Sequence, residues 1–131
     1  MKKNYNIIIV EDEETIQLIL SAFVKKFFAS LGAKCSVKAF TDPMQGLLEL
    51  SNNGHVYNVI MLDVRLPKLT GDELYSSLEL IDPELVKKVM FVTGYSSDLL
   101  DRFSGQDITI LEKPFRYPQF TAKVKHVLGL K

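Results

Sequence analysis

Five polar residues lie one or two positions after the end of a short apolar run, and their types together suit phosphoryl chemistry. Glu11 and Asp12 follow the first such run, Asp63 follows a later one, and Thr93 and Lys113 follow the last two. If these residues meet, three carboxylates share one pocket with a hydroxyl and an ammonium group. Clustered carboxylates repel one another, which raises at least one pKa unless a cation is present. The residue types therefore indicate a cation site.

Magnesium fits this set of side chains best. Hard oxygen ligands with room for water suit Mg²⁺, and three carboxylates, Lys113 and Mg²⁺ carry no net charge together. One carboxylate could then accept a phosphoryl group whose oxygens meet metal, lysine, hydroxyl and backbone N–H groups. An aspartate that forms an acyl phosphate is an established covalent strategy, and Asp63 is the candidate. Taken alone, Asp63 could equally be a strand-end aspartate that caps the next turn.

The elements that must position these residues can be predicted from the apolar pattern. Short runs of apolar, largely β-branched residues are typical of buried parallel strands. They occupy residues 7–10, 59–62, 89–92 and 108–111. Residues 34–40 instead alternate between apolar and polar, which predicts a strand at the sheet edge. Cys35 lies in that strand, and we interpret it as a small strand residue rather than a nucleophile.

Helical patterns separate these strands. Apolar residues at helical spacing run from Ile16 to Leu31, with Gly32 as the stop and Asp12 or a neighbour as the cap. Four further helices are predicted by caps, breakers and spacing: one opened by Asp42-Pro43, one over residues 74–81 ended by Asp82-Pro83, a weak one capped by Ser96 or Ser97 that runs to about Phe103, and a last one opened by Pro118.

The alternation of strand and helix, repeated about five times with short connections, predicts an α/β fold with a parallel sheet and helices on both faces. In a doubly wound sheet the carboxyl ends of the strands converge where the strand order reverses. That convergence would bring the five polar residues together. We expect residues 1–131 to form a single domain, with no effector domain in this chain.

Composition excludes several other classes of function. Lysine and arginine balance aspartate and glutamate at 16 each, which gives no general attraction to nucleic acid or membrane. The single cysteine cannot form an internal disulfide, and no apolar stretch is long enough for a signal peptide or a membrane span. We therefore expect a cytoplasmic protein with no direct nucleic acid or membrane partner.

Four sequence fragments, in this order, resemble the response regulator receiver domain of two-component signalling. They are Val10-Glu11-Asp12-Glu13, Met61-Leu62-Asp63 with Leu66-Pro67, Thr93-Gly94, and Glu112-Lys113-Pro114-Phe115. Each fragment alone is weak, but together they match the order and spacing of the family over nearly the whole chain. The resemblance implies a flavodoxin-like, CheY-like (βα)5 fold, which is a five-stranded parallel sheet of order 2-1-3-4-5 flanked by helices.

The resemblance also implies residue roles. Asp63 would take a phosphoryl group from a histidine kinase or histidine phosphotransfer protein. Mg²⁺ would be held by Glu11, Asp12, Asp63 and the backbone carbonyl of Arg65. The remaining site residues, Thr93 and Lys113, would each meet a phosphoryl oxygen, and Thr93 would reposition on phosphorylation. The bond between Lys113 and Pro114 is usually cis in this family, and cis peptides are essentially confined to proline.

The function implied is a signalling switch or phosphorelay intermediate whose last strand and its two flanking helices change on phosphorylation. Such a chain assists its own phosphorylation and autodephosphorylation and is not an enzyme in the ordinary sense. A phosphorylation-dependent homodimer is left open, as is the downstream target. The alternative is a degenerate receiver that acts as a phosphorylation-independent protein-interaction module. Loss of an acid, Thr93 or Lys113 would favour that alternative, yet all are present.

Three residues depart from the family pattern. Arg65 and Tyr95, two residues after Asp63 and Thr93 respectively, place bulk on both sides of the phosphoryl entrance, so we expect a long-lived phosphoaspartate. Ile110 stands where many receivers carry an aromatic switch residue. Tyr95 or Tyr117 could replace that switch.

Two other phosphate-related classes fit less well. A haloacid-dehalogenase-like phosphatase needs a second aspartate two residues after the nucleophile, where this chain has Arg65. A flavodoxin-like flavin binder needs a glycine-rich or hydroxyl-rich phosphate loop after the first strand, where this chain has acids instead. His55 and His126 have no acid partner nearby in sequence, and we interpret both as surface residues.

Overall fold

A computed structural model describes residues 3–131 and places five parallel strands in one sheet. The strands are β1 (Asn4–Val10), β2 (Lys34–Phe40), β3 (Val59–Leu62), β4 (Val89–Thr93) and β5 (Thr109–Glu112). Their spatial order, β2-β1-β3-β4-β5, confirms the predicted topology. Because β1 lies between β2 and β3, the chain winds outward in both directions from the β1–β3 pair, and the carboxyl ends of these two strands flank the switch point.

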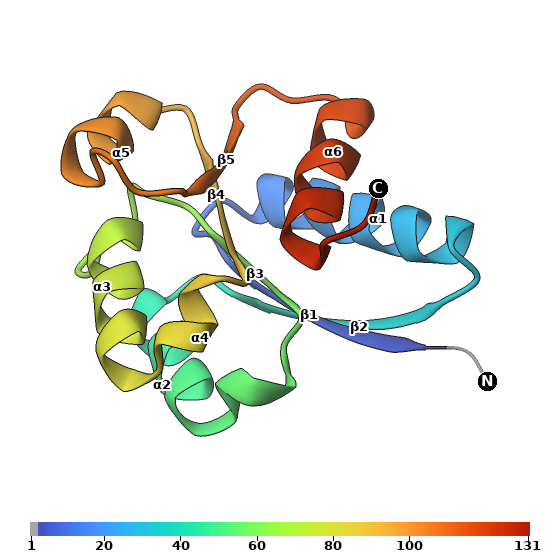
Figure 1. Cartoon of the computed structure of the whole chain (residues 1–131), viewed down its shortest axis with the longest axis horizontal. Coiled ribbons are helices and arrows are strands. Elements are labelled where there is room, and N and C mark those ends of the chain that lie inside the picture. Colours follow the sequence, from blue (N-terminus) through green and yellow to red (C-terminus); the bar gives the residue numbers. More distant parts are fainter. Residues whose placement is uncertain (1–2) are drawn as a thin grey trace.

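Helices cover both faces of the sheet (Figure 1). One face carries α1 (Glu14–Ser30) and α6 (Tyr117–Leu128), and the other carries α2 (Pro43–Asn53), α3 (Gly71–Ile81), α4 (Pro83–Val86) and α5 (Ser96–Arg102). A 3-10 turn, η1 (Gly54–Val56), follows α2. No helix in the described part of the chain has the length and apolar character needed to cross a membrane.

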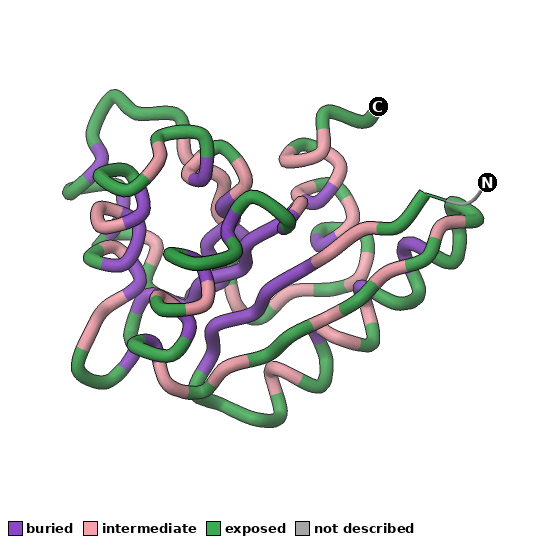
Figure 2. The backbone as a smooth tube through the Cα atoms, turned by 90° about the horizontal axis from the view of Figure 1, so that it is seen from below, coloured by how far each residue is buried: buried purple, intermediate pink, exposed green. Residues whose placement is uncertain are grey.

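Two hydrophobic cores, one on each face, hold these layers together. Successive β1 residues alternate between them: Ile7 and Ile9 pack with α1 and α6, whereas Ile8 and Val10 pack with the helices of the other face. Every residue of β3 and β4 is buried, while β2 at the edge is half-buried or exposed along its length (Figure 2). This difference explains why the central strands have uninterrupted apolar runs and β2 has an alternating one.

The first strand begins earlier than its apolar run predicts. β1 starts at Asn4 because Asn4 to Asn6 already pair with β2. The side chain of Asn58 accepts a hydrogen bond from the backbone N–H of Asn6 at 2.8 Å, and the backbone N–H of Asn58 donates to the carbonyl of Asn6. Polar residues therefore extend the strand through side-chain and edge pairing that apolar periodicity does not report.

The helix ends depart from prediction at two places, whereas the cap position of α1 falls on a neighbour of Asp12, as predicted. Glu13 occupies that position, and it makes no side-chain cap bond. Tyr95 rather than Ser96 or Ser97 precedes α5, again without a side-chain cap bond. Asp82 ends α3 as predicted, but its side chain also caps the unpredicted short helix α4, whose first residue is Pro83. A proline that ends one helix is also well suited to the first turn of the next.

Candidate functional site

The three predicted carboxylates do meet at the carboxyl edge of the sheet. Glu11, Asp12 and Asp63 each bring one oxygen into a group whose members all lie within 4.8 Å of one another. Glu11 and Asp63 are buried, with 1% and 5% of their surface exposed, while Asp12 is exposed. The cluster is thus open to solvent on one side only.

Backbone hydrogen bonds that continue the sheet set the positions of the site residues. The N–H of Glu11 donates to Phe40, that of Asp63 to Val10, and that of Lys113 to Thr93, all at 2.9 to 3.0 Å. Each bond joins the residue after one strand to the last residue of the neighbouring strand. The positions of the site residues are therefore set by the backbone hydrogen bonds at the carboxyl edge of the sheet.

The turn after Asp63 leaves no free space behind that residue. Gly71 begins α3, and a Cβ atom added there would lie 2.0 Å from the carbonyl oxygen of Asp63. The N–H of Gly71 also donates to the carbonyl of Val64 at 2.8 Å. Thr70 and Glu73 form a capping box at the same helix start, which fixes the entry of α3 into the core. Glycine is required here by close backbone approach.

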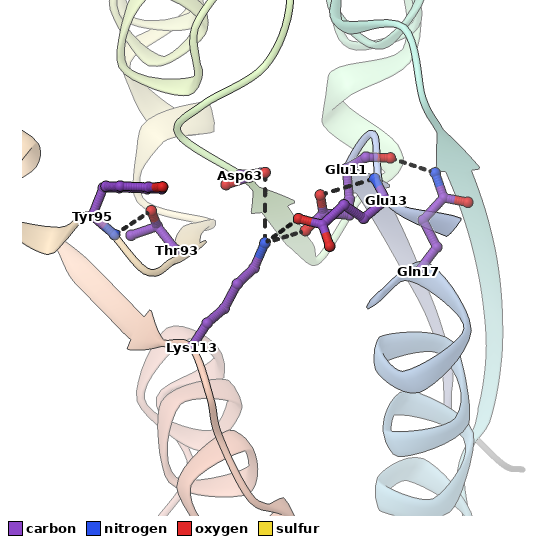
Figure 3. A network of polar contacts seen from close by, with 7 residues as sticks. All are labelled: Glu11, Glu13, Gln17, Asp63, Thr93, Tyr95 and Lys113. Carbon is purple, nitrogen blue, oxygen red and sulfur yellow. Dashed lines mark hydrogen bonds and ion pairs between the residues drawn. The ribbon is translucent and has the colours of Figure 1, made fainter. Parts of the chain in front are cut away.

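Lys113 joins the buried acids (Figure 3). Its Nζ atom lies 2.7 Å from Glu11 Oε1, 3.6 Å from Asp63 Oδ2 and 3.9 Å from Glu13 Oε1. The bond between Lys113 and Pro114 is cis, as the family resemblance implied. A single ammonium group thus contacts carboxylates from β1 and from β3.

The pKa values of Glu11 and Lys113 are both raised, but for different reasons. Burial raises the pKa of Glu11 to about 7, although the hydrogen bond from Lys113 lowers it, and the charge of Asp63 raises it further. For Lys113, burial lowers the pKa, but the hydrogen bond to Glu11 and the nearby Asp63 charge outweigh it and hold the pKa above its usual value. With three carboxylates and one ammonium group, the pocket has an excess of negative charge, and this favours binding of a cation.

The turn between β1 and α1 is braced by a residue that the sequence analysis missed. Gln17, one turn into α1, donates from Nε2 to the carbonyl of Glu11 at 2.6 Å, and the N–H of Glu13 donates to Glu11 Oε2 at 3.2 Å (Figure 3). The only available signal was that Gln17 is polar within an otherwise apolar helix segment. These bonds fix the acid-bearing turn from the helix side.

Thr93 is fully buried at the end of β4, and its Oγ1 accepts a 2.9 Å hydrogen bond from the backbone N–H of Tyr95. Because a hydroxyl accepts and donates independently, this bond leaves its proton free for another acceptor. Figure 3 shows the Tyr95 ring on the same side of the pocket, with its hydroxyl end directed toward Asp63.

Arg65 and Tyr95 contact each other beside this pocket. The guanidinium carbon of Arg65 lies 3.5 Å from the centroid of the Tyr95 ring, which is a cation–π stack. Both side chains remain about half exposed. Of the two aromatic residues considered as replacements for the switch, Tyr117 packs against Phe23 and Lys26 of α1. Tyr95 is the one that lies beside the site (Figure 3).

Other residues with reactive side chains lie elsewhere. His55 and His126 are exposed, as predicted for surface residues. Cys35 is half-buried in β2, and burial raises the pKa of its thiol, which makes it a poorer nucleophile. None of the three takes part in the acid cluster.

Fold and site together define a doubly wound α/β protein with an acid pocket and a lysine at the switch point. The sequence matches the response regulator receiver domain family over residues 7–125. The chain therefore belongs to this family, whose members are receiver domains of two-component systems.

Individual relatives support this assignment. The chain is 30% identical over 74 residues to the response regulator receiver protein CpdR of Brucella abortus, which covers 55% of this chain and 60% of CpdR. It is 32% identical over 71 residues to an uncharacterized response regulatory protein of Vibrio cholerae, covering 54% of this chain and 29% of that protein. The chain thus spans about a third to three fifths of the length of these relatives.

Solved structures share the same fold. A response regulator receiver domain protein from Clostridium thermocellum superposes with a TM-score of 0.80 at 18% identity, covering 95% of this chain and 94% of that one. The receiver domain of the sensor histidine kinase PA1611 from Pseudomonas aeruginosa superposes with a TM-score of 0.78 at 18% identity, covering 96% and 98%. That structure holds a magnesium ion in its active site cleft.

Proposed function

We propose that this chain is a phosphorylatable receiver that accepts a phosphoryl group on Asp63 in a Mg²⁺-dependent reaction. The donor is a histidine kinase or a histidine phosphotransfer protein of a two-component or phosphorelay system. One observation carries the proposal: Asp63 lies at a strand end within 4.8 Å of two other carboxylates and 3.6 Å from the Lys113 ammonium group.

The donor atoms at the sheet edge fit Mg²⁺. Glu11, Asp12 and Asp63 offer hard carboxylate oxygens, and the backbone carbonyl of Arg65 would be the fourth protein ligand. Water would complete the coordination on the exposed side, next to Asp12. Three carboxylates face a single lysine here, and the pKa of Glu11 is raised by burial and further by the charge of Asp63, so a divalent cation has negative charge to offset. Bound there, Mg²⁺ supplies positive charge to the phosphoryl oxygens.

Each protein residue then has a defined task. A carboxylate oxygen of Asp63 attacks phosphorus, the P–N bond to the donor imidazole breaks, and the electron pair returns to the ring nitrogen. Lys113 turns one charge-assisted hydrogen bond toward a phosphoryl oxygen. The hydroxyl of Thr93 donates a hydrogen bond to another phosphoryl oxygen, and Thr93 moves toward the phosphoryl group to do so. Because Thr93 Oγ1 is bonded to the N–H of Tyr95, the turn that begins at Tyr95 moves with it.

The surface that changes would be formed by α5, β5 and α6. A groove of about 580 Å³ lies between these elements and is lined by Leu100, Ile110, Pro114 and Lys123, among others. Leu100 is 61% exposed there, although it is a large apolar residue. Many receivers carry an aromatic switch residue where this chain has Ile110. Here Tyr95, whose N–H is bonded to Thr93, is the aromatic residue placed to move when Thr93 moves.

In this proposal the chain works in the cytoplasm as a phosphoacceptor that assists its own phosphorylation and autodephosphorylation, rather than as an enzyme that turns over a separate substrate. The alternative is a degenerate receiver that binds its partner without phosphorylation. The presence of every acid, together with Thr93 and Lys113, favours the first reading.

Intact mass measured after incubation with acetyl phosphate and Mg²⁺ tests the proposal. The wild-type protein should gain one phosphoryl mass, and Asp63→Asn should gain none. The control Asp107→Asn, at an exposed site two residues before β5, should behave as wild type. Omission of Mg²⁺ should abolish the gain. An unmodified wild-type protein would favour the phosphorylation-independent module.

A further inference from the structure

A third residue joins Arg65 and Tyr95 beside the phosphoryl pocket. The carboxylate of Asp98 lies 3.3 Å from the Nε atom of Arg65, whose guanidinium carbon lies 3.5 Å from the Tyr95 ring centroid. Asp98 is in the first turn of α5, and its N–H donates to the carbonyl of Tyr95 at 3.1 Å. Three side chains from two separate segments thus form one surface assembly.

We propose that Asp98 is a positioning residue that sets the lifetime of the phosphoaspartate by holding Arg65 over Tyr95. This inference rests on the proposed phosphorylation of Asp63. The long side chain of Arg65, free of Asp98, would sample several rotamers in solvent, since 57% of its surface is exposed. Held by Asp98, it covers the face of Tyr95 beside the route by which water reaches Asp63.

The position of Asp98 is itself fixed by the core. Its neighbour Leu99 is fully buried within α5, and Phe103, which ends that helix, stacks on Phe91 and contacts Tyr75. The carboxylate of Asp98 therefore projects from a helix that is anchored in the core through Leu99 and Phe103. An anchored carboxylate can orient a mobile guanidinium, whereas two mobile partners would lose more entropy on pairing.

Two other charged residues of α5 provide contrasts. Arg102 joins α5 to α3 through Asp72 at 2.7 Å and Ser76 at 3.1 Å, so attachment of the helix to the fold does not depend on Asp98. Asp101 is exposed and has no ion pair among residues 3–131. Replacing Asp101 removes the same charge from the same helix without touching Arg65.

The expected effect is moderate and depends on salt. An exposed ion pair and an exposed cation–π contact are each weak, so loss of Asp98 should speed autodephosphorylation roughly three- to tenfold. Salt shortens the screening length from about 10 Å at 0.1 M to about 3 Å at 1 M. The wild-type rate should therefore rise with salt toward the rate of Asp98→Asn, and the rate of Asp98→Asn should change less.

A double-mutant cycle tests whether Asp98 acts through Arg65. Each protein is phosphorylated with acetyl phosphate and Mg²⁺ and freed of donor, and its phosphoryl mass is followed with time. Asp98→Asn should shorten the lifetime, Asp101→Asn should not, and Asp98→Asn should add nothing once Arg65→Asn is present. Thermal unfolding midpoints of the five proteins (wild type, the three single variants and the double variant) separate loss of positioning from loss of folding.

The outcomes distinguish this inference from the proposed function. A wild-type protein that gains no phosphoryl mass overturns both. A phosphorylated protein whose lifetime is unchanged or longer in Asp98→Asn overturns the role of Asp98 and leaves phosphorylation standing. An effect of Asp98→Asn that is equally large in the Arg65→Asn background also overturns it, because the carboxylate would then act independently of Arg65.

Discussion

Lys113 donates a 2.7 Å hydrogen bond to Glu11, a residue 102 positions earlier in the chain. Both side chains are largely buried, and Glu11 is the more enclosed of the two, at 1% exposure against 18%. The ammonium group therefore partly neutralises a carboxylate whose own burial disfavours its charge.

The metal-free protein should lose stability as the pH rises through neutrality. The pKa of Glu11 is raised from 4.5 to about 7 by burial, so the folded state binds the proton more tightly than the unfolded state does. The resulting stabilisation is complete below pH 4.5 and is lost as the pH rises through about 7, which amounts to up to about 3 kcal/mol. Denaturant unfolding in a chelator across this range measures it.

Glu11→Gln should flatten this pH dependence, because glutamine has the shape of the protonated acid and does not titrate. Saturating Mg²⁺ should flatten it in the wild-type protein as well, since a bound cation favours the ionised form. A dependence that stays the same in Glu11→Gln would assign the effect to another group.

Asp12→Ala should weaken Mg²⁺ binding more than Glu13→Ala does. Asp12 contributes an oxygen to the acid cluster, while the Glu13 side chain is 64% exposed and reaches Lys113 only at 3.9 Å. Loss of a hard-oxygen ligand removes a direct bond to the ion, whereas loss of Glu13 removes a screened charge. Calorimetric titration with Mg²⁺ compares the two, and equal losses would mean that the ligands are misassigned.

The double change Arg65→Asn with Tyr95→Ala should speed autodephosphorylation and leave phosphorylation intact. Water must approach phosphorus in line, opposite the Asp63 oxygen. We expect the stacked pair to flank that approach, because the hydroxyl end of Tyr95 is directed toward Asp63 (Figure 3) and Arg65 lies over the Tyr95 ring. A tenfold change in rate corresponds to only about 1.4 kcal/mol. A time course that is unchanged in the double variant would instead favour a role of these exposed side chains in partner recognition.

Gly71→Ala should destabilise the fold and disturb the site together. The added Cβ would lie 2.0 Å from the carbonyl oxygen of Asp63, so either α3 or the turn after β3 must move. Overpacking of this kind costs about 1–3 kcal/mol. Denaturant unfolding gives the stability, and Mg²⁺ titration reports the displacement of Asp63.

Gly94→Ala is a suitable control for this change, because a Cβ at Gly94 meets nothing within 4 Å and its φ is not positive. It should leave stability within about 0.5 kcal/mol of wild type, as most surface substitutions do. Comparable losses in both variants would place the cost in the glycine backbone rather than in the contact with Asp63.

The sequence by itself indicated an α/β fold with a parallel sheet, and its resemblance to the receiver family implied the strand order and the roles of the site residues. Apolar runs that end at Glu11, Asp63, Thr93 and Lys113 predict parallel strands, and parallel strands with right-handed helical crossovers bring their carboxyl ends to one edge. The period of the apolar pattern reports burial, and burial is what distinguishes a central strand from an edge strand such as β2. Local pattern therefore sufficed for the strands, the helices and the parallel sheet, whereas the strand order followed from the family resemblance.

Only the tertiary structure decided which side chains contact one another at the pocket rim. Two examples are the hydrogen bond from Gln17 to Glu11 and the ion pair between Arg65 and Asp98. The distances between these atoms depend on how the loops and helices pack against the core. The same is true of Asn6 and Asn58, which lengthen β1 through a side-chain bond. Polar contacts of this kind are short in range and leave no periodic signal, so they follow from packing rather than from pattern.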